Sequence, residues 1–573
     1  MDSEAVSQAK KETKAQRSER LKREKNPWEA LEDIKAFART GRDSVAPEWL
    51  NTYFRWWGIY TQGDGAGALG GAGGEGKSTK YFMLRIPLPN GLLKSRQLRA
   101  IANLSARFGR GLADITVRQS IQLHWVEIEA VPEILETLAA EGISPKGACG
   151  DVVRNITGCP LAGVAADELI DASPLAREIG ELVRAQQDFY NLPRKFKISV
   201  TGCPVWCSYP EINDVGLTAT PRWRGGRREI GFSLRVGGGL SADPHLSVRL
   251  DAFVTYEQAP AVVKAVVEIF RDSDALRDNR KRARMKHLFT QYGWTRESFL
   301  DELNRRLGFT LDPAADENAP VDVFRDHVGV HAQKQPGHYH VGATVLGGRV
   351  TAKQMREAAD LAERFGSGEL RTTAMQNLLI VNVPRANVDL LIGGLNAAGL
   401  RVQASPFWRG AIACTGSEFC KLAITETKGF TRWVVEELEE RVPEFDQQLK
   451  LHVTGCPNSC GQHWISDIGL EGKKIKHNGA MNDAYYFCVG GAVGAFQQVA
   501  RPIGYRCIAP DVPAAIERAL RAYMRGRYDE ESLRGYFSRF SDDELRAQFS
   551  GEAVSEAVVR EAAAGVAPQE AGD

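Results

Sequence analysis

The 573-residue chain has 73 Lys and Arg against 72 Asp and Glu, a formal net charge of +1, so overall charge gives no reason to expect nucleic-acid binding. Its composition, 43% hydrophobic and 25% charged, is globular, and its length predicts about two to four domains. No apolar run reaches the roughly 18–20 residues of a membrane span, and no secretory apolar region begins the chain, so we expect a cytoplasmic protein that binds no membrane.

The first 48 residues predict an N-terminal basic helical arm (1–48). Residues 10–25 hold eight basic and three acidic side chains. Such a charge run is typical of a frayed, solvated helix, which is our interpretation; the alternative is an arm that attracts an acidic partner. Asn26, Pro27 and Glu29 then predict the start of a further helix.

Residues 62–78 are rich in glycine, which predicts a mobile loop. Within it, GAGGEGKS (71–78) matches the pattern of a phosphate-binding loop, which would make the protein an ATPase. A working loop of that kind lies between a buried strand and a helix. Here glycines precede the motif and a strand-like run, TKYFMLRIPLPNG, follows it, so we interpret the match as a coincidence.

Beyond residue 90 the chain repeats itself. Residues 91–109 align with 348–366 at a shift of 257, and the turn TGCP at 201–204 recurs at 454–457 at a shift of 253. Each aligned unit reads as a strand, an amphipathic helix and a strand. A repeat of this length indicates a duplicated pair of domains.

Eight of the ten cysteines fall in four close pairs, which in a chain of this kind indicates metal or redox ligands more than a disulfide framework. In the second half the pairs are Cys414-x5-Cys420 and Cys456-x3-Cys460. Four such thiolates can hold either a [4Fe–4S] cluster or a structural zinc ion. Zinc pairs usually have two to four intervening residues, which only the Cys456/Cys460 pair satisfies.

The flanking residues narrow this choice. CTGSEFCKLAITETK (414–428) together with TGCPNSCGQHWISDIGLEG (454–472) resembles the signature of the assimilatory nitrite and sulfite reductase family, over roughly residues 50–540. That resemblance implies an internally duplicated α+β fold. Its expected parts are two paired ferredoxin-like half-domains (49–145 with 330–405), a first catalytic domain (146–329), a second catalytic domain (406–550) and a C-terminal tail (551–573).

The resemblance also implies two cofactors, siroheme and a [4Fe–4S] cluster. By it, Cys414, Cys420, Cys456 and Cys460 hold the cluster, and Cys460 also bridges to the siroheme iron. Asn458 lies between the last two ligands and can hydrogen-bond near them. A cluster coupled to a haem can collect single electrons for a six-electron reduction.

The first half is then expected to supply cations for an anionic substrate. Lys195 and Lys197 are two residues apart on a predicted strand and so share a face. The family carries its substrate lysines in such a strand, and Arg154 and Arg85 occupy its arginine positions. A slip of the strand register would turn Arg85 away from the site.

Three more residues resemble siroheme-binding positions of the family: Arg118, Gln122 and Gln376. A macrocycle with many carboxylates suits arginine and amide donors. Cys203 and Cys207 copy the spacing of the ligand pair, and we interpret them as small core residues left by the duplication; with Cys149 and Cys159 they form an alternative four-thiolate site. Some relatives link a cysteine to a tyrosine beside the haem, which here makes Cys149 and Tyr60 candidates for such a bond.

The expected activity is the six-electron reduction of sulfite to sulfide, because a second lysine at position 197, where plant-type nitrite reductases tend to have Asn, suits the dianion. The alternative is reduction of nitrite to ammonia, and a more remote one is a structural zinc protein. No fingerprint of a nucleotide-binding reductase domain is present, so another protein must deliver the electrons. The family implies ferredoxin, and we expect a monomer.

Overall fold

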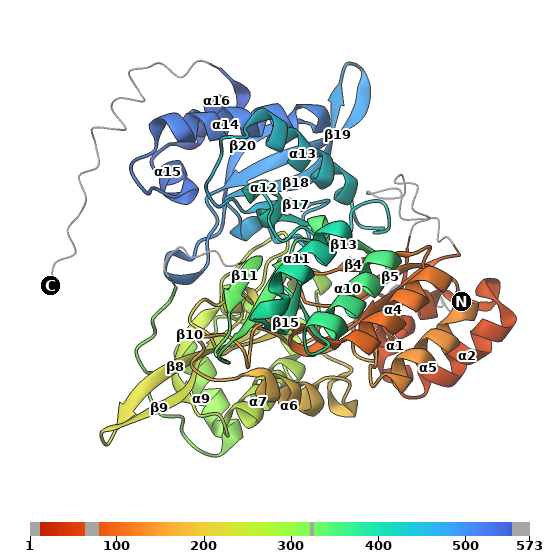
Figure 1. Ribbon diagram of the computed structural model, residues 1–573. Coiled ribbons are helices and arrows are strands. Elements are labelled where there is room, and N and C mark those ends of the chain that lie inside the picture. The colour runs from red at the N-terminus through yellow and green to blue at the C-terminus, as the bar shows by residue number, and fades with distance from the viewer. Residues whose placement is uncertain (1–11, 63–79, 321–325, 553–573) are drawn as a thin grey trace, which may run out of the picture.

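The computed structural model describes residues 12–62, 80–320 and 326–552. The match to a phosphate-binding loop at 71–78 and nearly all of the expected tail therefore lie outside the described residues. Within them the chain forms four five-stranded sheets, arranged as a duplicated α+β fold (Figure 1). No helix in the described ranges is long and apolar enough to cross a membrane.

Two of the sheets form the paired half-domains, and each sheet borrows a strand from the other half of the chain. The first contains β1 (Ile59–Thr61), β2 (Phe82–Ile86), β5 (Ile121–Val126), β4 (Leu112–Ile115) and β13 (Arg349–Thr351), in that spatial order. The second contains β11 (Gly329–Ala332), β12 (His338–Ala343), β15 (Leu378–Pro384), β14 (Glu369–Thr372) and β3 (Leu92–Lys94). This exchange of β3 and β13 fastens the two halves together.

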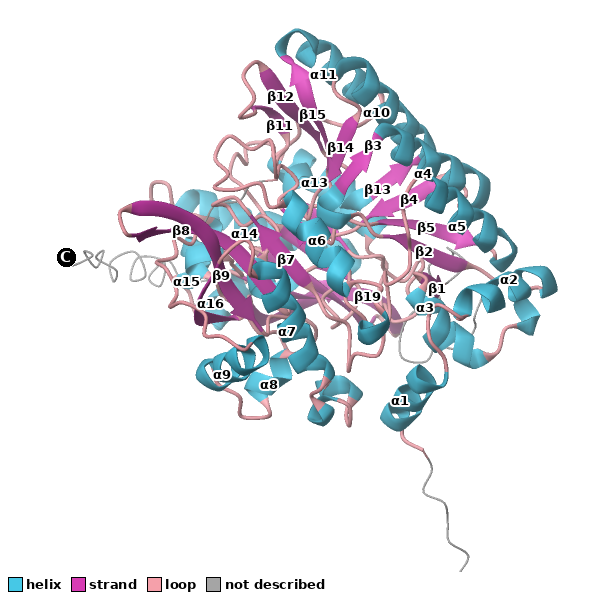
Figure 2. Ribbon diagram, turned by 90° about the horizontal axis from the view of Figure 1, so that it is seen from below, coloured by secondary structure: helices cyan, strands magenta, loops and turns pink. Residues whose placement is uncertain are grey.

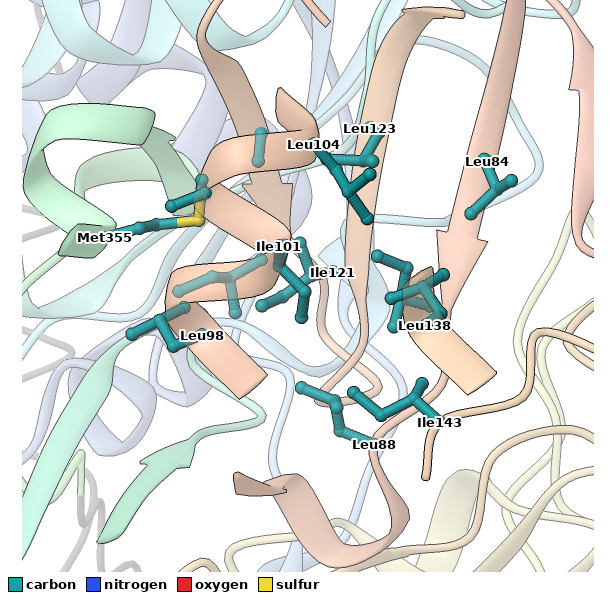
Figure 3. Packing of buried hydrophobic residues seen from close by; sticks show 14 of the residues in the cluster. Leu84, Leu88, Leu98, Ile101, Leu104, Ile121, Leu123, Leu138, Ile143 and Met355 are labelled. Carbon is teal, nitrogen blue, oxygen red and sulfur yellow. The ribbon is translucent and has the colours of Figure 1, made fainter. Parts of the chain in front are cut away.

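Helices cover one face of these two sheets, side by side in Figure 2. They are α4 (Ser95–Phe108), α5 (Val131–Ala140), α10 (Ala352–Phe365) and α11 (Val388–Ala397). Leu98, Ile101 and Leu104 recur at helical spacing on α4 and point into the core against Ile121 of β5 and Met355 of α10 (Figure 3). Truncating one such buried side chain to alanine typically costs about 2–5 kcal/mol.

The third sheet belongs to the first catalytic unit. Its strands, in spatial order, are β10 (Val248–Val254), β9 (Arg227–Val236), β8 (Val215–Arg224), β7 (Ile198–Thr201) and β6 (Thr157–Gly158). The strands β6, β7 and β8 are parallel, and the rest are antiparallel. The helices of this part are α6 (Ser173–Val183), α7 (Ala259–Arg271), α8 (Lys286–Thr290) and α9 (Arg296–Leu307).

The fourth sheet repeats this pattern in the second catalytic unit. Its strands are β16 (Ala411–Ala413), β17 (Leu451–Thr454), β18 (Ile468–His477), β19 (Ala480–Val489) and β20 (Arg501–Ile508), of which β16, β17 and β18 are parallel. The helices are α12 (Pro406–Gly410), α13 (Lys428–Arg441), α14 (Val512–Gly526), α15 (Leu533–Ser538) and α16 (Asp542–Ser550). Because parallel strands end at one sheet edge, β16 and β17 deliver their following loops to the same place.

The N-terminal arm corrects our expectation of a frayed, solvated helix. It continues from α1 (Lys14–Glu24), which is capped by Thr13, into α2 (Ala30–Thr40) and the short α3 (Phe54–Trp56). Lys22 is only 2% exposed and donates to the Leu192 carbonyl at 2.8 Å, and Glu19 pairs with Arg277 at 2.6 Å. Two charged side chains of α1 thus bind the helix to the first catalytic unit. The sequence pattern alone does not show these contacts.

Candidate active site

The four cysteines of the second half lie on two adjacent loops at the end of the parallel pair β16 and β17. Cys414 follows β16, and its sulfur accepts a hydrogen bond from the Gly455 N–H of the other loop at 3.2 Å. Cys460 acts electrostatically on each of the other three sulfurs. Burial, with the charge of Cys460 added, raises the pKa of Cys420 and of Cys456 to about 12. The fold therefore gathers all four thiols at one centre.

The spacing of these sulfurs separates a cluster from a single ion. A tetrahedral zinc with bonds of about 2.3 Å holds its thiolates about 3.8 Å apart. Among the described residues, no three of the four sulfurs lie within 4.8 Å of one another. The arrangement is too wide for one zinc ion, which argues against the structural zinc alternative, and it suits a larger cluster.

Main-chain N–H groups point at these sulfurs. Leu422 and Ala423 donate to Cys420, and Asn458 donates to Cys456. The Asn458 side chain also reaches the Cys456 sulfur at 3.5 Å. Such donors stabilise thiolates and tune the potential of iron–sulfur clusters, so the donor set fits a [4Fe–4S] cluster. Cys460 is exposed, unlike Cys456, so its sulfur is open to a second group.

Two buried side chains position the loops that carry these cysteines. Gln376, held at a positive φ of 64°, accepts from the Ala413 N–H at 3.0 Å and donates to the Ala413 and Ile115 carbonyls. Its amide N–H groups are thus used by the main chain next to Cys414. His452 on β17 bonds to the Gln462 carbonyl at 3.1 Å and so closes the turn that contains Cys456 and Cys460.

Cations of the first half face this centre. The lysines lie just before β7 and not on it, which corrects the sequence prediction. Phe196 between them is fully buried and forms a single β-bridge with Val153, through hydrogen bonds with Val152 and Arg154, so Lys195 and Lys197 point away from the buried side. Cys460 contributes to the electrostatic environment of Lys195 and of Arg85. Lys195 and Arg85 therefore lie near Cys460, and Lys197 and Arg154 act electrostatically on the same group of cations.

These cations are crowded, and their pKa values show it. Burial, with Arg284, Arg194 and Arg154 nearby, lowers the pKa of Lys195 to about 7. Burial together with Arg118 and Lys195 lowers the pKa of Lys197 well below its ordinary value. A pocket wall with this surplus of positive charge favours an anion, which would restore the ordinary charge of both lysines.

The residues that the sequence placed near Arg85 also come together. Arg85 on β2 is the cross-strand neighbour of Gln122 on β5, so both share one face. With its amide oxygen turned toward Arg85, Gln122 accepts from Nη2 at 2.6 Å and from Nε at 3.2 Å. Arg85 Nη1 donates to the Cys149 sulfur at 3.0 Å, and the guanidinium lies 5.4 Å from the Tyr60 ring centre. Tyr60 and Cys149 thus both contact Arg85.

Arg118 is tied into the protein more tightly than the sequence indicated. It donates to the Asn213 side chain at 2.7 Å and to the Asn155 and Ile198 carbonyls at 2.6 and 3.2 Å, and its buried Nε has no hydrogen-bond partner. Burial and Arg154 lower its pKa to about 9. Nε and the second N–H of Nη1 are therefore left for a carboxylate of a bound group.

Sequence reasoning missed an ion pair behind the lysines. Asp214 accepts from the Lys197 main-chain N–H at 2.8 Å and pairs with Arg284 at 2.8 Å. Its counterpart in the second half, Asp467, accepts from the Lys450 N–H at 2.7 Å. The repeated runs NDVGL (213–217) and SDIGL (466–470) contained the signal, because the aspartate recurs at the same shift of 253 as the TGCP turns.

Comparisons with known proteins agree with this geometry. The nitrite and sulphite reductase 4Fe-4S domain matches residues 149–311 and 405–556, and the nitrite/sulfite reductase ferredoxin-like half domain matches 75–141 and 331–398. An assimilatory ferredoxin-dependent nitrite reductase of Haloferax mediterranei is 38% identical over 88% of both chains. A sulfite reductase [ferredoxin] 1 of Mycolicibacterium paratuberculosis is 36% identical over 92% of this chain and 96% of its own. The solved structure of Mycobacterium tuberculosis NirA protein is similar with a TM-score of 0.87 and 35% identity, covering 92% of this chain and 97% of NirA.

Proposed function

Because the chain belongs to the nitrite and sulfite reductase family, an oxidoreductase family that carries siroheme and a [4Fe–4S] cluster, we propose that it reduces sulfite to sulfide with electrons from ferredoxin. In this proposal Cys414, Cys420, Cys456 and Cys460 would hold the cluster, and Cys460, the exposed one, would also serve the siroheme. When bound, the two cofactors would supply the redox chemistry and the relay of single electrons. The protein residues bind the anion and deliver protons.

The observation that carries the choice of sulfite is the pair Lys195 and Lys197 on one face, opposite the buried Phe196. Two ammonium groups beside Arg154 and Arg85 match a dianion with three oxygens better than the smaller monoanion nitrite. Releasing the oxygens of sulfite as water also consumes protons. Lys195, whose pKa is lowered to about 7, is charged below that pH and can donate a proton near neutrality.

Gln122 and Arg85 form the adjoining wall, and we propose that both, with the free Nε of Arg118, face the acidic edge of the siroheme. Gln376 has a different part in this proposal. Its amide is occupied by main-chain groups beside Cys414, so it positions a cluster ligand. Only its remaining oxygen lone pair is left for a contact with the siroheme.

Nitrite is the second candidate substrate, and a specific finding favours it: the relative from Haloferax mediterranei, at 38% identity, is named a nitrite reductase. The deciding experiment is steady-state kinetics of the purified coloured protein with reduced ferredoxin and each anion in turn. We expect kcat/KM to be higher for sulfite. A higher value for nitrite would assign the second activity instead, and a colourless protein without iron would refute both.

A further inference from the structure

A second group of cysteines lies in the first half, away from the proposed cluster. The sulfurs of Cys159, Cys203 and Cys207 all lie within 4.8 Å of one another. They are 2%, 2% and 8% exposed, and apolar side chains such as Leu161, Val164 and Leu379 pack around them. Cys203 and Cys207 are buried in the core, as expected. Of the two further cysteines in the alternative four-thiolate site, Cys159 lies beside them, whereas Cys149 accepts a hydrogen bond from Arg85.

This trio occupies the same places in the first half as the cluster ligands do in the second. Cys159 corresponds to Cys414, and the turn with Cys203 and Cys207 corresponds to the turn with Cys456 and Cys460. Both sets follow a parallel strand pair, β6 with β7 and β16 with β17. The fourth place differs, because the residue six positions after Cys159 is Ala165 where the second half has Cys420.

The supports of the two sites also correspond. Gln119, held at a positive φ of 56°, accepts from the Gly158 N–H at 3.0 Å, just as Gln376 accepts from Ala413. Gly158 itself permits no side chain, because a Cβ there would lie 1.9 Å from the Asn90 oxygen. The residue before the first cysteine is therefore fixed in place in both halves, which is what a preorganised ligand needs.

Hydrogen-bond donors converge on one sulfur of the trio. The Val205 N–H donates to the Cys203 sulfur, as the Asn458 N–H does to Cys456, and the thiols of Cys159 and Cys207 also donate to Cys203. Arg371, 5% exposed, acts on Cys159 electrostatically. A buried cation next to thiols compensates the negative charge that remains when thiolates bind a divalent ion.

We propose that Cys159, Cys203 and Cys207 bind a single soft d10 cation, zinc or copper(I), as a structural site. Thiolates around zinc stand about 3.8 Å apart. The sulfurs of the trio, all within 4.8 Å of one another, come near this spacing, whereas no three of the sulfurs of Cys414, Cys420, Cys456 and Cys460 do. Binding forms metal–sulfur bonds, releases the thiol protons to water and transfers no electrons. His327, 3% exposed, acts electrostatically on Cys203 but does not belong to the group of ligand atoms within 4.8 Å of one another, so the protein ligands are the three sulfurs. Ala165 in place of a fourth cysteine removes the ligand that an iron–sulfur cube would need.

The proposed metal site lies where the first catalytic unit contacts the paired half-domains. The loop that begins at Cys159 is bonded to the second half, because Lys334 donates from its main-chain N–H to Val164 at 3.0 Å and pairs with Glu168. Strand β15 of the second half-domain sheet contributes Leu379 and Val381 to the same cluster. A metal ion here therefore stabilises the contact between the first catalytic unit and the paired half-domains.

The test is metal analysis of the holoprotein by mass spectrometry for zinc, copper and iron, followed by X-ray absorption at the edge of the metal found. We expect about one zinc or copper per chain with sulfur neighbours at about 2.3 Å. In Cys203→Ser this metal should fall to about a tenth of the wild-type content, with the iron content and visible spectrum retained. Cys507→Ser, which removes a buried cysteine of the second half, is the matched control and should keep the metal.

Three results would overturn the proposal: iron-replete wild-type protein without zinc or copper, metal retained in Cys203→Ser, or metal without sulfur neighbours. A disulfide within the trio, found as a cross-linked peptide after digestion of the unreduced protein, would be a fourth. The wild-type analysis decides even if the variant fails to fold, and Cys207→Ala offers a second variant. Missing iron would refute the reductase, whereas missing zinc and copper refute only this site.

Discussion

Replacing Lys197 by Asn is the sharpest perturbation of the proposed substrate preference. Unit charges about 4 Å apart at an effective dielectric constant of about 20 interact with about 4 kcal/mol, and a dianion loses one such interaction more than a monoanion does. Neighbouring groups and water weaken this interaction in the half-buried site. We therefore take about a third of that energy, ~1.4 kcal/mol or tenfold, as the extra loss in transition-state binding for sulfite compared with nitrite. The neighbouring cations also favour the dianion. Because burial, Arg118 and Lys195 lower the pKa of Lys197, this lysine needs a nearby anion to keep its proton.

The assay is the ratio of kcat/KM for sulfite to kcat/KM for nitrite, measured with one reduced ferredoxin and one enzyme preparation. We expect the ratio to fall about tenfold in Lys197→Asn while the visible spectrum stays unchanged. Lys281→Asn, which removes an exposed lysine of the same unit, should leave the ratio as it is. A ratio within about twofold of wild type in Lys197→Asn would refute the electrostatic argument for sulfite.

Four other outcomes follow from the same contacts. Cys460→Ser should abolish electronic coupling between siroheme and cluster, and a spectrum that still shows coupling would reject the shared sulfur. A covalent bond between Tyr60 and Cys149 would make the intact chain lighter by two hydrogens, a deficit that should vanish in Tyr60→Phe. Burial lowers the pKa of His452 from 6.5 to about 3, so the folded state excludes a proton that the unfolded state binds below pH 6.5. Stability is thus lost as pH falls, by about 2 kcal/mol at pH 5, and urea unfolding of His452→Asn should show a shallower pH dependence. Arg284→Met should free Asp214 to attract Lys197 and raise the KM for sulfite several-fold, with nitrite as the comparison.

The sequence could predict those features that depend on short spacing. The cysteine pairs, the TGCP turns and the alternation of Lys195 and Lys197 about Phe196 are each contained within a few residues, and the repeat relates one half to the other. The predicted strand and helix units at 91–109 and 348–366 were confirmed as α4 and α10 with their flanking strands. The cofactor and family assignment was confirmed by the comparisons.

The sequence could not predict contacts between residues far apart along the chain. The docking of α1 joins Glu19 to Arg277, and no local pattern marks which solvated-looking charge has a buried partner so far along the chain. Arg284 behind Asp214 is a similar case. The sequence also could not show how far apart the sulfurs lie within each group of cysteines. Cys203 and Cys207 have the same spacing in sequence as Cys456 and Cys460, yet only the first pair belongs to a group with all sulfurs within 4.8 Å of one another.

The duplicated turn explains how one half came to supply cations while the other supplies sulfur. In the second half Lys450, the counterpart of Lys197, lies 3.5 Å from the carboxylate of Asp467, which neutralises it. In the first half Arg284 pairs with the corresponding Asp214. Since a carboxylate already bonded to a guanidinium attracts an ammonium less strongly, Asp214 leaves Lys197 poorly compensated, and the pKa of Lys197 stays lowered until an anion binds beside it. Arg284 thus distinguishes two lysines at matching positions of the repeat, and under the proposed function only Lys197 meets the substrate.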